Sequence, residues 1–326
     1  MPNEWRPTCS IELLHLRAQL FAEIRQFFSA RAVLEVETPL LSYCSGTDPQ
    51  LDFFTTDYCS PPLRHTLFLQ TSPEFAMKRL LAAGSGSIYQ LCKAFRNGES
   101  GRYHNPEFSL LEWYRVGFTL TQLMEEVGEL IAVLFNGRKT LNSSQRFAYQ
   151  ELFQSHTGLN PLVFSYQDYC AYARDNDQPD AVSICGYDHG LWLDFIFSHN
   201  IQPHLGENAV CMVYGYPACQ SSLARINEGN PNVTDRVEVF INGVELGNGY
   251  YELTDAKEQD RRFDKEIAIR QQRKSPITVK DKHLIAAMEA GLPECSGMAI
   301  GLDRLLMLLT NSANINDVLN FPVHRA

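Results

Sequence analysis

The chain lacks the signals of a membrane, secreted or zinc-binding protein. No apolar run approaches the length of a membrane span, and residues 1–6 contain no signal-like apolar stretch. Its nine cysteines are odd in number and scattered, and no two form a Cys-x-x-Cys pair. These absences argue against a zinc site or a disulfide framework. We therefore expect a cytoplasmic protein with buried free thiols and no membrane contact.

Positive charge is also scarce. The chain has 28 lysine and arginine residues against 38 aspartate and glutamate residues, which gives a net charge of −10. Nucleic-acid binding usually needs a basic face, because contacts to phosphates supply most of the affinity. A tRNA ligand is therefore not expected. An acidic surface with a local basic pocket fits a small anion such as ATP, and it also suits a basic protein partner.

Repeats, low-complexity segments and long linkers are absent from the sequence. The 326 residues, 44% of them hydrophobic and 20% charged, are typical of a soluble globular protein. Apolar residues at helical spacing predict a helix over residues 10–30, and residues 298–302 predict a short strand that leads into a last helix. We expect residues 1–326 to form one domain with a partly helical insertion around 119–205.

Residues 91–108 are the most informative stretch of the chain. They contain three lysine or arginine residues, the titratable His104 and, at the end, the aromatic Phe108. Turn-forming Asn-Gly and Ser-Gly pairs lie in the middle, so the pattern predicts strand, loop, strand. Such a loop can bind a nucleotide, with arginine on phosphate and an aromatic ring under the base. Taken alone, the stretch is equally typical of a basic surface hairpin.

Residues 237–246 predict an acidic β-hairpin. Two apolar runs flank Asn242-Gly243, the preferred loop of a type I′ turn. In this register Phe240 faces Glu245, and Glu238 lies on the same face, diagonal to Glu245. Diagonal neighbours are roughly 7–8 Å apart, so the two carboxylates can share one cation, and Mg²⁺ prefers such oxygen ligands. The alternative is two solvated glutamates on an exposed face.

Two further segments carry candidate binding residues. Residues 72–74, Ser-Pro-Glu, are a helix start, with Ser72 as N-cap, Pro73 at the first helical position and Glu74 in the first turn. Residues 246–253 combine glycines, which allow a ligand to approach the backbone closely, with Glu252. A carboxylate at the end of a pocket suits a substrate with a cationic side chain, although a surface glutamate is also possible.

Three segments, in order, resemble the three motifs of the class II aminoacyl-tRNA synthetases, and the second resembles the lysyl type. They are residues 32–40 for motif 1, residues 95–97, 104–108 and 111–114 for motif 2, and residues 297–304 for motif 3. The resemblance covers nearly the whole chain. It implies an α+β fold, a mostly antiparallel sheet flanked by helices, and a homodimer built on motif 1.

The resemblance also assigns site residues. For ATP it implies Arg96, Asn97, Gly98, Glu99, His104, Asn105, Phe108, Glu245, Leu246, Gly301 and Arg304. For the amino acid it implies Ser72, Pro73, Glu74, Tyr114, Asn248, Tyr250, Glu252 and Ala299. For Mg²⁺ it implies Glu238 and Glu245.

The implied reaction is amino-acid activation by ATP to an aminoacyl-adenylate. The substrate carboxylate is already ionised at neutral pH, so catalysis needs positioning and charge stabilisation rather than a general base. Arg96 would hold the α-phosphate, and Arg304, at a helix N-terminus, the γ-phosphate. These two arginines are the candidate catalytic residues.

Two positions depart from the lysyl-tRNA synthetase pattern. Gly98-Glu99 stands where that family has glutamate directly after Arg-Asn, so the acid that reads adenine has moved by one position. Ala299 replaces a glycine of motif 3, and a methyl-sized change alters substrate discrimination by roughly 1–3 kcal/mol. Motif 1 also starts at Ala32, which leaves no room for an anticodon-binding OB domain.

These features resemble the elongation factor P–lysine ligases. That family transfers (R)-β-lysine from the adenylate to a lysine side chain of elongation factor P. Two alternatives remain: a truncated lysyl-tRNA synthetase that charges tRNA, and a non-catalytic sensor of lysine or its adenylate.

Overall fold

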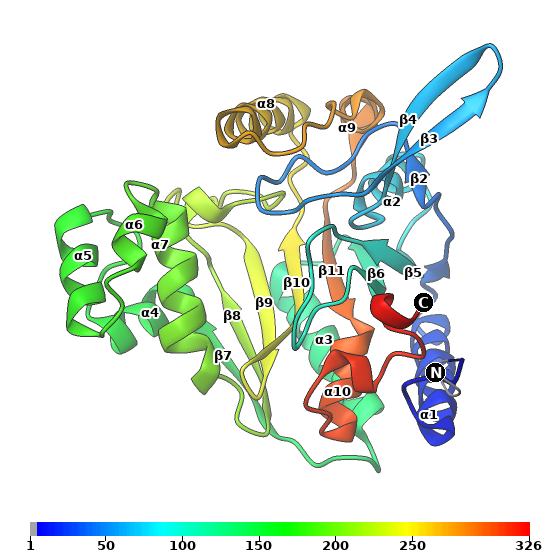
Figure 1. The fold of residues 1–326 in the computed structure, drawn as a ribbon, viewed down its shortest axis with the longest axis horizontal. Coiled ribbons are helices and arrows are strands. Elements are labelled where there is room, and N and C mark those ends of the chain that lie inside the picture. The colour runs from blue at the N-terminus through cyan, green and yellow to red at the C-terminus, as the bar shows by residue number, and fades with distance from the viewer. Residues whose placement is uncertain (1–4) are drawn as a thin grey trace.

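A central eight-stranded sheet organises the computed structural model, which describes residues 5–326 (Figure 1). The strand order is β1-β5-β6-β11-β10-β9-β8-β7, antiparallel except for the β1–β5 and β7–β8 pairs. The bounds are β1 Leu34–Glu35, β5 Ile88–Phe95, β6 Glu107–Val116, β7 Asn142–Ala148, β8 Ala209–Tyr214, β9 Arg236–Ile241, β10 Val244–Tyr251 and β11 Cys295–Gly301. The α+β prediction is confirmed. Residues 1–6 were expected to contain no signal-peptide-like apolar stretch. Of these, residues 1–4 lie outside the described residues.

One face of the sheet is covered by α1 (Ile11–Ser29), α3 (Leu120–Phe135) and α10 (Leu302–Thr310). Ser10 caps α1, and Thr119 forms a capping box with Gln122 at the start of α3, so local signals fix where both helices begin. Apolar side chains of the three helices meet the inward-facing residues of β6, β9, β10 and β11 in the largest core of the molecule.

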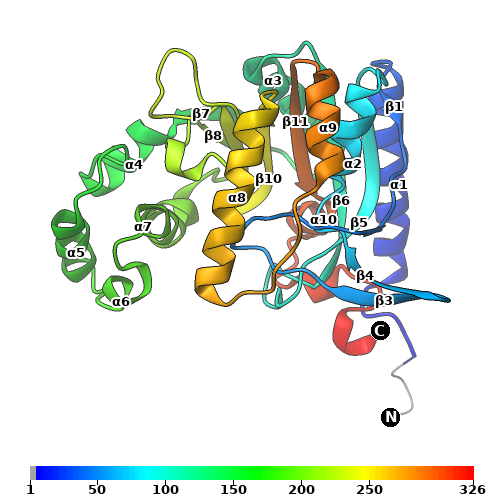
Figure 2. The same ribbon diagram turned by 90° about the horizontal axis from the view of Figure 1, so that it is seen from above.

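The opposite face lies under α2 (Glu74–Ala82), α8 (Ala256–Arg273) and α9 (Lys282–Gly291), which run side by side in Figure 2. Their apolar residues form a second core with β5 and β6. A three-stranded sheet, in the order β2 (Leu41–Ser42), β4 (Leu63–Leu69) and β3 (Thr55–Ser60), extends from this side as a projecting hairpin (Figure 1).

The loop between β2 and β3 crosses this face and is held by α8. Arg270, whose side chain is fully buried, donates hydrogen bonds to the carbonyls of Asp48 at 2.6 Å and Leu51 at 2.8 Å. Thr47, in the same loop, donates a hydrogen bond to Glu266 of α8. The loop therefore forms a fixed roof over the sheet.

Within residues 119–205, α3 belongs to the main core, and β7 pairs with β8 at the edge of the sheet. A separate helical unit follows, formed by α4 (Tyr149–Thr157), α5 (Tyr166–Asp175), α6 (Ala181–Cys185), α7 (His189–Ile196) and the π-helix η1 (Phe197–Ile201). This helical unit has its own core, which also includes residues of β8 and β9.

Two expectations about cysteine and membrane contact can be compared with the described residues. All nine cysteines are free, but the expectation that they are buried holds for only five, and Cys59 and Cys219 are exposed. In residues 5–326 no helix is long and apolar enough to cross a membrane, and no group of three or more metal-ligating side chains occurs.

Candidate active site

Two rows of side chains cross four strands and form the floor of a cavity of about 430 Å³. The first row runs Glu112 on β6, Ala299 on β11, Asn248 on β10 and Glu238 on β9, each opposite the next in strand register. The second row, two residues along each strand, is Tyr114, Gly297, Tyr250 and Arg236. Because strand side chains alternate between faces, both rows point under α2 and the roof loop.

Gly297 is required by this arrangement. A Cβ atom at this position would lie 2.5 Å from the ring of Tyr114 and 2.6 Å from the carboxylate of Glu252. The first glycine of the motif 3 resemblance therefore makes room for two neighbouring side chains of the site.

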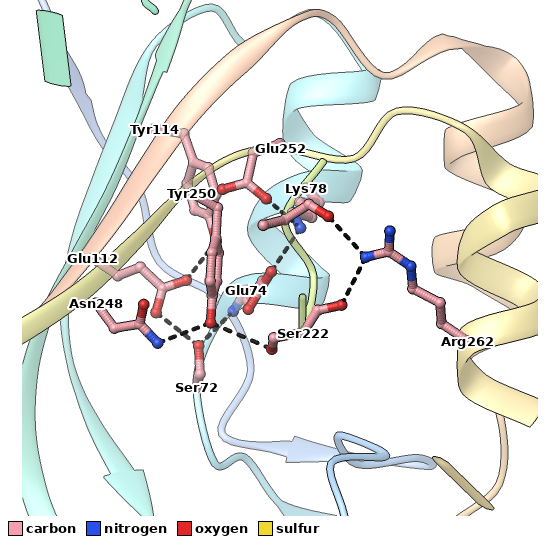
Figure 3. A network of polar contacts seen from close by, with 11 residues as sticks. Ser72, Glu74, Lys78, Glu112, Tyr114, Ser222, Asn248, Tyr250, Glu252 and Arg262 are labelled. Atoms are coloured by element: carbon pink, nitrogen blue, oxygen red, sulfur yellow. Dashed lines mark hydrogen bonds and ion pairs between the residues drawn. The ribbon is translucent and has the colours of Figure 1, made fainter. Parts of the chain in front are cut away.

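A buried lysine lies at the end of the cavity (Figure 3). Lys78 of α2, 1% exposed, places its Nζ 2.6 Å from Glu74 Oε1 and 2.6 Å from Oε2 of Glu252, which is also 1% exposed. Burial alone would lower the pKa of Lys78, but the two carboxylates together raise it above its usual value. Lys78 was not predicted from the sequence, although it lies one helical turn after Glu74 and therefore on the same face.

Glu112 is a second residue that the sequence analysis did not assign to the site. It accepts hydrogen bonds of 2.7 Å from Ser72 Oγ and 2.7 Å from the hydroxyl of Tyr114. Burial, with a further contribution from the neighbouring Glu74, raises its pKa to about 8. The sequence did contain a signal for Glu112: it lies two residues before Tyr114 on β6, so both side chains point to the same face of the sheet. Glu74, Glu112 and Glu252 all line the cavity, so a cationic ligand finds several carboxyl oxygens there as hydrogen-bond acceptors.

The start of α2 differs by one residue from the sequence prediction. The helix begins at Glu74 with Pro73 at the N-cap, and Ser72 donates its hydroxyl to Glu112. Ser72 Oγ still accepts a hydrogen bond of 3.1 Å from the Glu74 amide, so it ties the helix start to the cavity floor.

The far wall is braced by α8. Arg262 donates hydrogen bonds to the carbonyls of Ser222 at 3.0 Å and Ala224 at 2.7 Å, while Ser222 Oγ lies 3.3 Å from the Tyr250 hydroxyl (Figure 3). Asn248 donates a hydrogen bond of 2.9 Å to the same hydroxyl. The ring of Tyr250 is thus fixed from both sides.

The raised pKa of Glu112 makes stability depend on pH. Glu112 has a higher pKa in the folded chain than in the unfolded chain, so its stabilising contribution is present below the unfolded pKa of about 4.5 and is lost as pH rises through about 8. Glu112→Gln removes this titration. We expect the variant to melt about 3 °C or more above the wild type at pH 9, with a smaller difference at pH 5, in thermal scans. An equal shift at both pH values would contradict the assignment.

A second, smaller cavity of about 100 Å³ adjoins the first where motif 2 and motif 3 meet. Of the residues expected to bind ATP, its lining includes Arg96, Glu99, His104, Asn105, Phe108, Glu245, Leu246, Gly301 and Arg304. Asn97 and Gly98 are not in the lining of either cavity. The Asn97 amide instead bonds to the carbonyl of Asp52, which attaches the motif 2 loop to the end of the roof loop.

Both candidate catalytic arginines are held in place. The guanidinium of Arg96 lies 5.0 Å from the ring centre of Phe108 and 3.5 Å from Glu99. Arg304 donates a hydrogen bond of 2.8 Å to the carbonyl of Glu245 and lies 2.7 Å from His104 Nε2. Burial and the Arg304 charge lower the pKa of His104, so its neutral ring can accept this hydrogen bond at neutral pH.

Asn105 also lines this cavity, but its side chain serves the fold. Its amide nitrogen donates a hydrogen bond of 2.6 Å to the carbonyl of Glu107, and its oxygen accepts one of 3.2 Å from the amide of Val323. These bonds fasten the C-terminal segment to the motif 2 loop.

The acidic hairpin forms with the predicted turn, but the strand pairing around Glu238 differs from the prediction. Asn242 and Gly243 have φ values of 51° and 72°, as a type I′ turn requires, and Phe240 faces Glu245. A β-bulge between Glu245 and Gly247 then shifts the pairing, so that Glu238 lies opposite Asn248 rather than Gly247. Glu238 and Glu245 nevertheless line the same cavity.

Glu238 is held in a polar setting. It accepts a hydrogen bond of 2.6 Å from the hydroxyl of Tyr216 and forms an ion pair with Arg236. Burial raises its pKa to about 7; Arg236 acts in the opposite direction, and the nearby Glu245 adds to the rise. Two carboxylates that repel each other in one cavity suit a divalent cation.

The family assignment follows from comparison with known proteins. Residues 5–325 match the family of class II tRNA synthetases (D, K and N). The chain is 45% identical over 326 residues to an elongation factor P–(R)-β-lysine ligase of Vibrio cholerae, with 99% of each chain covered. It is 44% identical to the ligase of the same name from Haemophilus ducreyi, covering 99% of this chain and 97% of that protein. It is 43% identical to that of Yersinia enterocolitica, covering 99% and 98%. The chain therefore belongs to the class II tRNA synthetase family and, within it, to the group of elongation factor P–(R)-β-lysine ligases.

Proposed function

We propose that this protein activates (R)-β-lysine with ATP and transfers it to a lysine side chain of elongation factor P. The observation that carries the proposal is the cavity lined by Glu74, Glu112 and Glu252, which adjoins the nucleotide cavity at Arg96. A diamino acid has two ammonium groups, and the pocket offers Glu74, Glu112 and Glu252 as acceptors.

The first step is attack of the substrate carboxylate on the α-phosphate, with release of pyrophosphate. Arg96 lies on the border of both cavities, where it can stabilise the charge that develops on the α-phosphate. Arg304, in the first turn of α10, is suited to the γ-phosphate, and Phe108 offers its ring to the adenine. Arg96 already lies over that ring, so the arginine and the base would share one aromatic surface.

Glu238 and Glu245 fit a Mg²⁺ ion, because both are carboxylates of the amino-acid cavity and Glu245 also lines the nucleotide cavity. When bound, the ion would neutralise phosphate charge. The two side chains orient it, while Arg236 and Tyr216 keep Glu238 in position.

The preference for a β-amino acid is assigned to Ala299. Its methyl lies in the cavity floor between Glu112 and Asn248. We expect Ala299→Gly to improve activation of α-lysine relative to (R)-β-lysine by about 10-fold, the effect of one methyl group in a substrate pocket. The ratio of kcat/KM in pyrophosphate exchange measures it. An unchanged ratio would remove Ala299 from the account of specificity.

A protein acceptor, rather than tRNA, is supported by the names of the relatives and by the net charge of −10. The proposal includes a cytoplasmic location and a homodimer. The dimer rests on the motif 1 resemblance and on exposed apolar side chains in that segment, Leu34 and Leu40 among them.

The test is intact-mass spectrometry of elongation factor P after incubation with the protein, ATP, Mg²⁺ and (R)-β-lysine, with tRNA offered in a parallel tube. A mass gain of one lysine on the factor, with tRNA uncharged, is the expected result. Charged tRNA with an unmodified factor would indicate a truncated lysyl-tRNA synthetase. Absence of pyrophosphate exchange with any lysine isomer would indicate a sensor.

A further inference from the structure

A third cavity, of about 370 Å³, lies between the helical unit and the sheet, and no step described above uses it. Its walls come from α7, η1 and the segment before β9, and they include Asp194, Phe195, His199 and Gln220. Glu238 and Glu245 also line it, so this cavity lies directly beside the active site. Glu245 borders all three cavities.

The third cavity presents hydrogen-bond acceptors that have no donor. Gln220 Nε2 donates a hydrogen bond of 2.6 Å to Asp194 Oδ1, which turns Gln220 Oε1 away from that carboxylate. Among residues 5–326, neither this buried oxygen nor the hydroxyl of Tyr149 has a hydrogen-bond partner. Tyr149 is 1% exposed and lines the cavity. Buried polar groups are nearly always paired. Two unpaired oxygen atoms on residues that line one cavity therefore point to a ligand that donates hydrogen bonds.

The charges specify the ligand further. Asp194 is exposed and borders the cavity. Desolvation by the surrounding protein raises the pKa of its carboxyl to about 6 against the lowering effect of Arg236, so the group remains largely ionised at neutral pH. Arg236 is already paired with Glu238. A primary ammonium group supplies three donors and one positive charge, which matches a carboxylate and two neutral acceptors.

Aromatic walls suit the rest of a lysine side chain. The rings of Phe195 and His199 stack at 4.2 Å, and the ring of Tyr149 lies 5.2 Å from that of Phe197. A four-carbon stem can lie against such rings while its ammonium group reaches the polar end.

On the basis of the proposed function, we infer that this third cavity is the subsite for the acceptor lysine of the protein substrate, with Asp194, Gln220 and Tyr149 as its binding residues. The amino-acid, nucleotide and acceptor subsites then meet at Glu245. In the transfer step the bound ammonium releases one proton to solvent through the cavity mouth. The free amine attacks the adenylate carbonyl carbon, a C–N bond forms, the bond from that carbon to the AMP oxygen breaks, and the nitrogen loses a second proton.

The test separates transfer from activation. Asp194→Asn, which keeps the shape of the side chain, should raise the KM for elongation factor P about 10-fold or more, since a hydrogen bond to a charged group is lost. Pyrophosphate exchange with (R)-β-lysine should remain within about twofold of wild type. Tyr149→Phe, which deletes only an unpaired hydroxyl and so spares the fold, should shift the same KM by about threefold, the value of one neutral hydrogen bond. Asp175→Asn, exposed at the end of α5, is the matched control.

Three other results would each contradict the proposed acceptor subsite or the function on which it rests. An unchanged acceptor KM in Asp194→Asn would overturn it. A parallel fall in exchange and transfer would assign the cavity to activation instead. A wild-type protein that exchanges pyrophosphate but never modifies elongation factor P would overturn the proposed function itself. Failure of the further inference is distinguishable from this, because there the wild type transfers (R)-β-lysine to elongation factor P and only the KM of the variant is compared with it.

Discussion

Lys78→Met should be the most destabilising single substitution at the site. Methionine keeps the length of the side chain but leaves the carboxylates of Glu74 and Glu252 buried without their cation. Removing one partner of a buried pair costs about 3–5 kcal/mol of unfolding free energy. Urea unfolding at pH 8 measures the loss.

The pH dependence and a double variant provide the controls. Without Lys78, the pKa of Glu252, already raised by burial to about 7, rises further, so the carboxyl is neutral at pH 5.5 and the deficit should shrink there. Lys78→Met combined with Glu252→Gln removes both charges and should recover most of the stability. Equal stability of Lys78→Met and wild type at pH 8 would show that the ion pair contributes nothing.

Arg96→Ala should abolish most activation. Arg96 borders both the amino-acid and the nucleotide cavity, and removing a preorganised donor to a developing negative charge typically costs about 10²–10³ in rate. Pyrophosphate exchange measures the loss. Arg96→Lys should recover only part of it, because lysine cannot reproduce the planar two-donor geometry.

A neighbouring cation is the control for Arg96. Lys93 lies three residues earlier on β5, is 43% exposed, and pairs with Glu107 at 3.4 Å. Lys93→Ala should leave exchange within about twofold of wild type, since exposed ion pairs contribute little. Exchange by Arg96→Ala within threefold of wild type would remove this residue from catalysis.

The sequence was sufficient where the determining signals are local. The Asn242-Gly243 turn predicted the Phe240–Glu245 pair, and the Asn-Gly and Ser-Gly pairs marked the motif 2 loop correctly. Glu112 could have been found as well, because side chains two apart on a strand share a face. The β-bulge after Glu245 was not predicted, although Gly247, a glycine inside a strand, is a typical signal of a bulge.

Contacts between distant segments were beyond reach of the sequence alone. The Lys78–Glu252 pair joins α2 to the residue after β10, and the sequence of neither segment predicts contact with the other. The acceptors of the third cavity likewise come from the helical unit and a separate loop. Only the folded sheet brings them beside Glu238.

The roof loop fixed by Arg270 has a kinetic consequence. An aminoacyl-adenylate is an activated ester that water hydrolyses, so an enzyme that forms one before its acceptor arrives must preserve it. Three hydrogen bonds from the buried guanidinium of Arg270, to the carbonyls of Asp48 and Leu51 and to the carboxylate of Asp52, bind that loop to α8. We therefore expect the roof loop to protect the intermediate from water for as long as Arg270 and the Thr47–Glu266 hydrogen bond hold it in place.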